Sequence, residues 1–185
     1  MDIAALMNST HFAHSQQVAK ISSILAQLAG YTAEETEVTC QAALFHDIGK
    51  NAIPHTILNK PGKLTPEEFH IVQTHTTIGQ EQLTREVQAL GAAIIVAQQH
   101  HERLDGSGYM GLGERHIHPY AKLVAVADVF DALVSRRSYK EPWDIERTSK
   151  YLRGLAGIQF DCQFTTLLLD NMAQILALYD GEKTA

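Results

Sequence analysis

Seven side chains spread along the 185-residue chain could together bind metal ions. They are five imidazoles and two carboxylates: His14, His46, Asp47, His75, His100, His101 and Asp128. Imidazole combined with carboxylate favours iron, manganese or zinc over calcium or magnesium. Neighbouring helical residues such as His46-Asp47 and His100-His101 point about 100° apart, so they suit two adjacent ions better than one. Two-metal sites of this kind support phosphoryl or hydrolytic chemistry.

An ordinary structural role must be weighed for each of these residues. A single histidine on an amphipathic helix, such as His14 or His75, is usually a surface residue or a hydrogen-bonded core residue. Asp128 is different, because it interrupts the apolar run 123–130 and a buried carboxylate is costly there without a cation. As a set, the residues favour a metal site, and the absence of cysteine ligands argues against structural zinc.

Apolar residues recur at helical spacing along the chain, without the alternation of a β protein. Helix starts are predicted at Thr32, which forms a capping box with Glu35, and at Thr65, which a proline follows. The glycine-rich segment 106–113 is expected to be a loop. The expected helices cover approximately residues 14–28, 33–47, 66–78, 90–101, 119–135, 145–152 and 164–178. We therefore predict one all-α domain over residues 1–185, with the candidate ligands at helix ends or on inner faces.

The composition restricts the partners and the location that we expect. The formal net charge of −6 argues against binding DNA or RNA polymers, which need a basic surface. The apolar run 92–97 is too short to span a bilayer, and the N-terminus lacks the pattern of a signal peptide. The two cysteines, Cys40 and Cys162, show no disulfide framework. We expect a cytoplasmic protein without membrane insertion.

A series of motifs runs in order along nearly the whole chain: His14-Ser15, His46-Asp47-Ile48-Gly49-Lys50, Ile53-Pro54, Ile57-Leu58, residues 60–65, Glu68-Phe69, His75, His100-His101-Glu102, Asp105-Gly106-Ser107-Gly108-Tyr109, residues 128–133, residues 137–140 and Phe160-Asp161. This series is similar to that of HD-GYP domains, a family of cyclic di-GMP phosphodiesterases in the HD superfamily. An isolated His-Asp pair would be weak evidence, whereas this ordered series is specific. The resemblance implies an HD-domain helical bundle with an additional helical hairpin.

The resemblance also implies the reaction and the roles of individual residues. It implies hydrolysis of cyclic di-GMP to linear pGpG, and in many members on to GMP, by water that two metal ions activate. All seven candidate side chains match family metal ligands; among them Asp47 matches the bridging carboxylate. Lys50 matches a lysine beside the nucleophile. The residues that match substrate contacts are Lys50, Gly108, Tyr109, Arg137 and Lys140.

The cofactors that the resemblance implies are two divalent ions per chain. Iron or manganese is expected first, and zinc or nickel could replace them in a preparation. Thr10 lies four residues before His14, where some members have a glutamate that supports a third metal, so we expect two metals. Diguanylate cyclase domains are the protein partners that the family suggests.

Met110 departs from the family pattern, because the motif has proline at this position. The loss of proline removes the restriction on φ, so we expect a looser loop around an intact site. This departure keeps open a catalytically weak module that binds cyclic di-GMP or docks a diguanylate cyclase. The histidine set alone would also suit an HD phosphohydrolase for another nucleotide, although segments 105–109 and 137–140 argue against it.

Overall fold

The computed structural model describes residues 9–86, 91–136 and 141–180, and these ranges form helices joined by turns and loops. The elements are α1 (Ser9–Leu28), α2 (Ala33–Leu44), the 3-10 helix η2 (Ile48–Ala52), α3 (His55–Leu58), α4 (Pro66–Gln73), α5 (His75–Glu86), α6 (Gly91–Gln99), the 3-10 helix η3 (Glu114–His116), α7 (Pro119–Val134), α8 (Ile145–Leu155), α9 (Cys162–Asp170) and α10 (Met172–Asp180). Within the described ranges, extended pairing consists of isolated bridges between Asp105 and Gly113 and between Ala156 and Phe160. The predicted all-α fold is confirmed.

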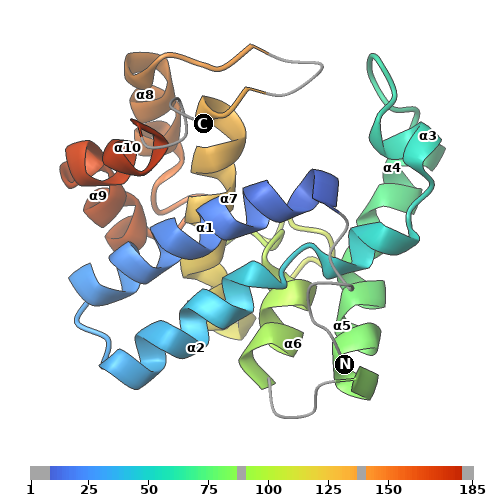
Figure 1. The fold of residues 1–185 in the computed structure, drawn as a ribbon, viewed down its shortest axis with the longest axis horizontal. Helices are drawn as coiled ribbons and strands as arrows, with labels where there is room; N and C mark the ends of the chain where they lie inside the picture. The colour runs from blue at the N-terminus through green and yellow to red at the C-terminus, as the bar shows by residue number, and fades with distance from the viewer. Residues whose placement is uncertain (1–8, 87–90, 137–140, 181–185) are drawn as a thin grey trace.

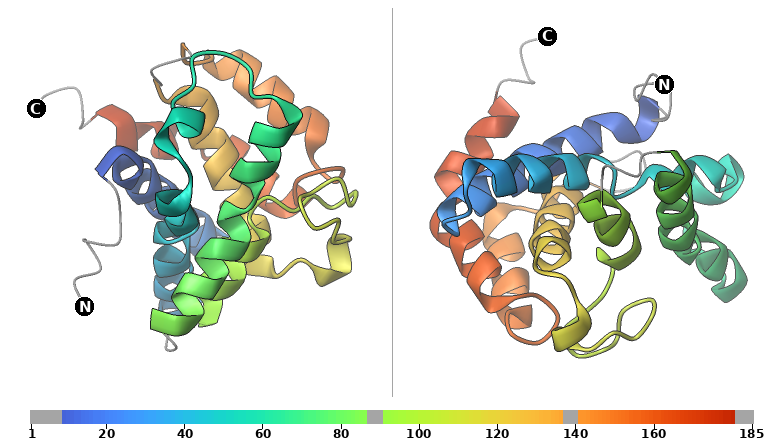
Figure 2. Two further views of the ribbon diagram at one scale, coloured as in Figure 1. Left: turned by 90° about the vertical axis from the view of Figure 1, so that its right-hand side faces the viewer. Right: turned by 90° about the horizontal axis from the view of Figure 1, so that it is seen from below.

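Helix α7 lies at the centre of the fold (Figure 1). It packs against α1, α2, α6, α8 and α9, and in the view from below it lies between the C-terminal helices and the α5–α6 pair (Figure 2). Leu123, Val124, Ala127 and Phe130 are fully buried in its core-facing surface. Asp128 is therefore carried by the most buried helix of the bundle, as the apolar run around it indicated.

Helices α1 and α2 pack against each other and lie across α7 (Figure 1). The turn between them contains Gly30 and leads to the predicted helix start at Thr32. Gly30 adopts φ +82°, and the backbone N–H of Tyr31 donates to the carbonyl of Ala26 at 3.0 Å, which ends α1. Thr32 and Glu35 then form the capping box that starts α2. This connection orients α1 so that its inner face lies over α7.

Two predicted helices are divided in the structure. The segment predicted over 66–78 breaks at Thr74 into α4 and α5, and the segment 164–178 breaks at Asn171 into α9 and α10. At both breaks, the side chain of the intervening residue donates a hydrogen bond to a carbonyl of the preceding turn. Thr74 Oγ1 donates to the carbonyl of Ile71 at 2.7 Å, and Asn171 Nδ2 donates to that of Leu167 at 2.8 Å. Thr74 and Asn171 are thus the C-cap residues at which α4 and α9 end.

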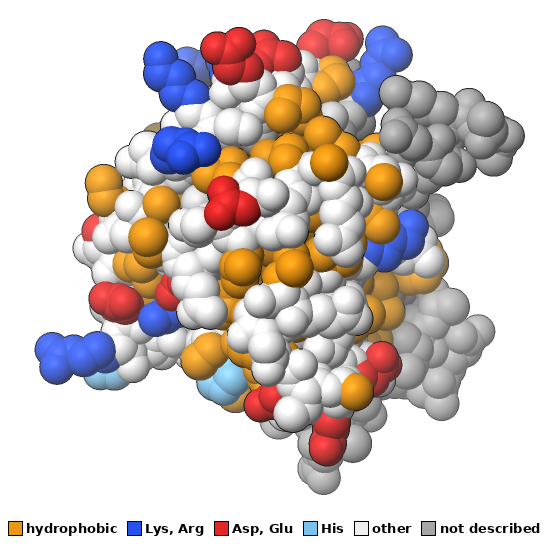
Figure 3. All heavy atoms as spheres, turned by 90° about the vertical axis from the view of Figure 1, so that its left-hand side faces the viewer, with side chains coloured by type: hydrophobic (Ala, Val, Ile, Leu, Met, Phe, Trp, Pro, Cys, Tyr) orange, Lys and Arg blue, Asp and Glu red, His pale blue; other side chains and the backbone are white. Residues whose placement is uncertain are grey.

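The surface in Figure 3 is the face at the left of Figure 1. Lys and Arg side chains are interspersed there with acidic and apolar ones, so no continuous basic track crosses the described part of this face. Apolar exposure includes Leu28, Tyr151 and Ile158 as individual side chains. Among the helices that the structure describes, none combines the length and the apolar character needed to cross a bilayer.

Candidate metal centre

Three of the candidate histidines lie where one helix ends. His46 follows the end of α2, His75 follows α4 and opens α5, and His100 follows α6. In each, the ring Nδ1 lies close to a carbonyl oxygen of the preceding turn. The nearest such oxygens belong to Ala43, Val72 and Val96, at 2.7, 2.6 and 3.1 Å. Since a carbonyl only accepts, Nδ1 must donate, and Nε2 is left with its lone pair for another partner.

This arrangement corrects the prediction that the helices continue through His46-Asp47 and through His101. These residues lie in turns beyond α2 and α6. The three carbonyls also accept backbone N–H groups at these helix ends, so each imidazole is a second donor to its carbonyl. The same hydrogen bond fixes the ring orientation, so the helix ends themselves direct three Nε2 atoms inward.

Asp47 lies between these histidines, in the turn before η2, and it is almost completely buried. Its Oδ1 is 3.3 Å from Nε2 of His75 and 3.6 Å from Nε2 of His100. Its other oxygen, Oδ2, is 3.3 Å from Nε2 of His46 and 3.9 Å from Nε2 of His14. The two oxygens of one carboxylate thus face two different pairs of histidines.

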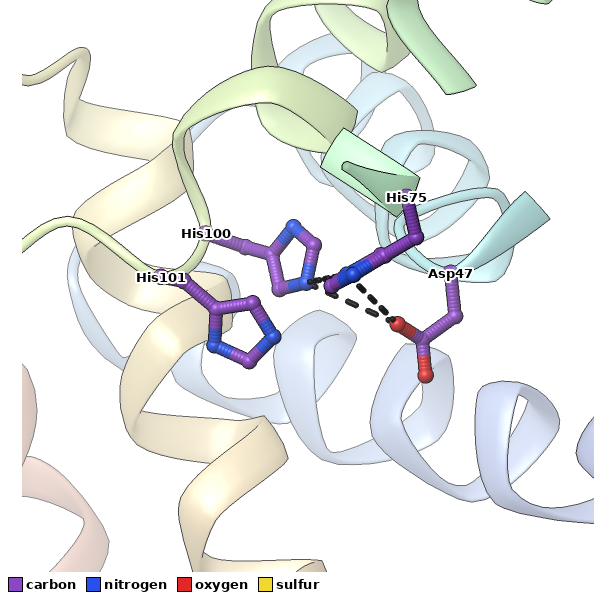
Figure 4. Close-up of side chains that lie close together, drawn as sticks. All are labelled: Asp47, His75, His100 and His101. Carbon is purple, nitrogen blue, oxygen red and sulfur yellow. Dashed lines mark hydrogen bonds and ion pairs between the residues drawn. The ribbon is translucent and has the colours of Figure 1, made fainter. Parts of the chain in front are cut away.

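The candidate ligands form two compact groups. Asp47, His75, His100 and His101 form the first (Figure 4), and His14, His46 and Asp128 form the second. Within each group one ligand atom from every residue lies within 4.8 Å of the others. All seven sequence-predicted residues are therefore brought together from α1, α7 and the ends of α2, α4 and α6.

The polar atoms of this cluster need a positive partner. Nε2 of His46 and Oδ1 of Asp47 are buried and have no hydrogen-bond partner among the described residues. The Nε2 atoms of His75 and His100 are only 3.3 Å apart, and both carry lone pairs if both Nδ1 atoms donate. A divalent cation would satisfy all these atoms at once, so the residues fit a metal site.

For Asp47, Asp128 and His100, the electrostatics of the cluster favour the protonation states of metal ligands. Burial raises the pKa of Asp47, but the opposing effect of its charged neighbourhood, above all the charge of Lys50, holds the pKa well below its usual value. Burial likewise opposes ionisation of Asp128, and its hydrogen bond to His14 keeps its pKa well below normal. Burial lowers the pKa of His100 to about 4. Both carboxylates are then anionic and His100 is neutral, as metal binding requires.

His14 belongs to the second group and is held by two carboxylates. Its Nε2 lies 3.1 Å from Oδ1 of Asp128, and its Nδ1 lies 2.6 Å from Oδ2 of Asp131. Burial lowers the pKa of His14, but these two hydrogen bonds outweigh it and raise the pKa to about 9. In the absence of a cation, a proton on His14 therefore balances the two carboxylates.

Lys50 and Tyr109 lie at the border of the cluster. Nζ of Lys50, within η2, donates to Oδ2 of Asp47 at 2.5 Å, and its side chain is mostly buried. The ring of Tyr109 is 4.5 Å from that of His101 and 6.0 Å from that of Phe69, which is 46% exposed. Burial raises the pKa of Tyr109 to about 12, so its hydroxyl stays protonated.

Gly108 brings the loop 105–113 against the end of α6. A Cβ at this position would lie 2.5 Å from Cα of Glu102, so only glycine permits the approach. The buried carboxylate of Glu102 accepts the backbone N–H groups of Met110 and Leu112, at 2.8 and 2.7 Å. These contacts place Tyr109 over His101.

Sequence reasoning assigned no role to Glu102 or Asp131. Both lie inside motifs that the sequence displayed, directly after His101 and three residues after Asp128. Each side chain is only 2% exposed, and this burial, which the sequence does not show, is what marks the two residues as part of the site. The predicted substrate contacts Arg137 and Lys140 lie outside the described residues.

The HD domain family model matches residues 1–164 of this chain. The chain therefore belongs to the HD domain family. Among solved structures, the HD-GYP-type protein Bd1817 from Bdellovibrio bacteriovorus superposes with a TM-score of 0.74 at 25% identity, covering 88% of this chain and 52% of that one. The HD domain of the L. monocytogenes phosphodiesterase PgpH, in complex with cyclic-di-AMP, shares the fold with a TM-score of 0.65 at 22% identity, covering 94% and 92%.

Curated relatives support the HD-GYP assignment. The cyclic di-GMP phosphodiesterase response regulator RpfG of Xanthomonas campestris is 40% identical, over 86% of this chain and 43% of that protein. A cyclic di-GMP phosphodiesterase of Thermotoga maritima is 43% identical, over 92% and 47%. The 3'3'-cGAMP-specific phosphodiesterase 2 of Vibrio cholerae is 40% identical, over 90% and 32%. The chain spans less than half the length of these three relatives.

Proposed function

We propose that this chain is a metal-dependent phosphodiesterase that hydrolyses cyclic di-GMP. The observation that carries the proposal is the position of Asp47, whose two carboxylate oxygens face two separate groups of histidines. A carboxylate between two such groups suits a bridging role between two cations. The relatives named as cyclic di-GMP phosphodiesterases, at 40% and 43% identity, supply the substrate class.

Two cations are proposed, one for each group of ligands. His14, His46 and Asp128 would hold one of them, and His75, His100 and His101 the other, with Asp47 shared between them. Bound there, divalent ions would lower the pKa of a water molecule and stabilise the charge that develops on a phosphodiester. Iron or manganese fits this imidazole-rich set best, and zinc or nickel could occupy it during preparation.

Lys50 is proposed to act on the same phosphodiester. Its Nζ already lies at Asp47 Oδ2, so a modest movement of its side chain would bring a positive charge to a phosphate oxygen beside the cluster. Gly108 is proposed to admit the substrate to the loop, and Tyr109 to contact a guanine base through its ring. Arg137 and Lys140 complete the proposed set as phosphate contacts.

A second substrate is favoured by one specific comparison. The Vibrio cholerae relative named as 3'3'-cGAMP-specific is as similar in sequence as the RpfG relative, at 40% identity. A mixed guanine–adenine dinucleotide has the same phosphodiester ring and differs in one base. The metal cluster would treat both alike, so discrimination between them would depend on the base contacts around Tyr109.

The proposal is tested by assaying the protein after anaerobic purification. Cyclic di-GMP and 3'3'-cGAMP are incubated with it in the presence of Fe²⁺ or Mn²⁺, and the products are separated by chromatography. We expect pGpG, and GMP at longer times, from the wild type. Asp47→Ala should lower the rate by about 10³-fold, because several kcal/mol of transition-state stabilisation is lost. His116→Ala, an exposed histidine outside both groups, is the matched control and should retain activity.

Two outcomes would replace the proposal. Binding of cyclic di-GMP by metal-loaded protein without any product would indicate a nucleotide-sensing module or a docking partner of a diguanylate cyclase. Cleavage of mononucleotides in preference to cyclic dinucleotides would indicate a general HD phosphohydrolase.

We further propose that residues 1–185 act as one domain and that the protein is cytoplasmic, which agrees with its free cysteines Cys40 and Cys162.

A further inference from the structure

His14 differs from the three histidines that end helices. It lies within α1, where the carbonyls of the preceding turn are used by the helical ladder. Its Nδ1 lies at the carboxylate of Asp131 on another helix, whereas the Nδ1 atoms of His46, His75 and His100 lie at carbonyls of their own preceding turns. Another group must fix the orientation of this ring if Nε2 is to face the cluster.

Asp131 supplies that group. One oxygen, Oδ2, lies 2.6 Å from Nδ1 of His14. The other, Oδ1, accepts the hydroxyl of Ser135 at 2.8 Å and the hydroxyl of Tyr179 at 2.8 Å. The carboxylate is 2% exposed. Because both hydroxyls occupy Oδ1, the carboxylate cannot rotate without losing two hydrogen bonds, and Oδ2 stays directed at His14.

The hydrogen bond from Tyr179 connects the C-terminal helix α10 to the carboxylate of Asp131. It lies in α10, which packs against α1 and α9, and it is beyond residue 164, where the match to the HD domain family ends. Its own position is fixed by packing of its ring against Phe130 on α7, with the centroids 6.4 Å apart. Burial and the charge of Asp131 raise the pKa of its phenol, so the hydroxyl remains a donor.

We infer that Asp131 is a positioning residue for a metal ion bound through His14, and that Tyr179 of the C-terminal helix α10 holds Asp131 in place. A carboxylate behind a ligating imidazole fixes the tautomer and strengthens the ligand, and its removal typically costs about 10–100-fold in metal affinity. The alternative is that Asp131 only joins α1, α7 and α10 structurally. The inference rests on the proposed metal site for the claim that His14 is a ligand.

The two roles predict different patterns of metal binding. The intact chain is stripped of metal, and binding of Mn²⁺ is measured by the decrease of the free-ion paramagnetic resonance signal. Asp131→Asn should weaken one of the two Mn²⁺ sites by about 10–100-fold and leave the other unchanged. Tyr179→Phe should weaken the same site by a smaller factor. Asp170→Asn, which removes an exposed carboxylate on α9, is the matched control and should bind Mn²⁺ like the wild type.

A double variant tests whether Tyr179 acts through Asp131. In the Asp131→Asn background, Tyr179→Phe should have no further effect on Mn²⁺ affinity, whereas independent roles would give additive losses. Unchanged affinity in either folded single variant, or an equal weakening of both sites, would overturn the inference. If Asp131→Asn does not fold, the Mn²⁺ affinity of Tyr179→Phe alone tests the inference. A wild-type protein that binds no Mn²⁺ would refute the proposed function as well, a result distinct from failure of the variants alone.

Discussion

The backbone N–H of Met110 donates to Oε1 of Glu102 at 2.8 Å, and a proline at position 110 could not make this bond. The departure from the Gly-Tyr-Pro motif is therefore accompanied by a hydrogen bond to a buried carboxylate, beside the second bond from the N–H of Leu112. The expected loosening of the loop stays a prediction, and the structure identifies the contact on which the loop's order would depend.

Restoring the family proline should therefore weaken substrate binding in this chain. Met110→Pro removes a hydrogen bond to a charged group, and we expect KM for cyclic di-GMP to rise by about tenfold, near 1.4 kcal/mol. Met110→Ala keeps the N–H and should stay within about twofold of the wild type. Steady-state kinetics with equal metal loading measures both. A KM that falls in Met110→Pro would show that the φ restriction matters more than the hydrogen bond.

Substitutions in the two ligand groups should remove metal ions separately. His101→Ala should leave the group around His14 able to bind, and Asp128→Ala should leave the group around His75 able to bind. Each variant should then contain about one metal per chain where the wild type contains two, and Asp47→Ala should contain the least. Elemental analysis after anaerobic purification measures this. Three metals per wild-type chain would contradict the expectation from Thr10.

Gly49 should be required for the fold around the metal centre. A Cβ there would lie 2.0 Å from the carbonyl oxygen of His75 and 2.6 Å from the backbone nitrogen of Gly79, and neither atom belongs to a flexible side chain. Gly49→Ala should lower the free energy of unfolding by about 3 kcal/mol or more. Gly91→Ala is the matched control, because its Cβ would meet nothing within 4 Å. Urea unfolding measures the free energy of unfolding of the two variants. Similar denaturation midpoints for Gly49→Ala and Gly91→Ala would contradict the expectation.

Acid should release the contact between Lys60 and Glu68. The hydrogen bond from Lys60, and then that from the Thr65 backbone, lower the pKa of Glu68 below 4.5. A lowered carboxyl pKa means that its stabilising contribution is present above pH 4.5 and is lost as the pH falls through the folded-state value. Lys60→Met should raise the Glu68 pKa, whereas Lys63→Met should not. The Glu68 carboxyl chemical shift, followed by NMR between pH 2 and 7, measures the pKa in both variants. Identical Glu68 titration curves in Lys60→Met and Lys63→Met would show that Lys60 does not lower this pKa.

The sequence by itself determined the helical fold and the chemistry of the candidate site. Helical spacing and local caps are encoded within a few residues, as in the Thr32–Glu35 box, so they could be predicted. The ligand types were equally visible, because a buried carboxylate in an apolar helix is costly without a cation. Where the helices end was not predictable from the sequence: α2 ends before His46, α6 ends before His100, and Thr74 separates α4 from α5.

Only the tertiary structure decided how those residues are grouped. The division of the seven candidate ligands into two groups around the two oxygens of Asp47 depends on where α1, α2, α4, α6 and α7 cross. Asp131 and Tyr179 are 48 residues apart in sequence, and Asp131 and His14 are 117 apart. No periodicity or spacing encodes such pairs, because their hydrogen bonds form only when the packed core brings the helices together and excludes water.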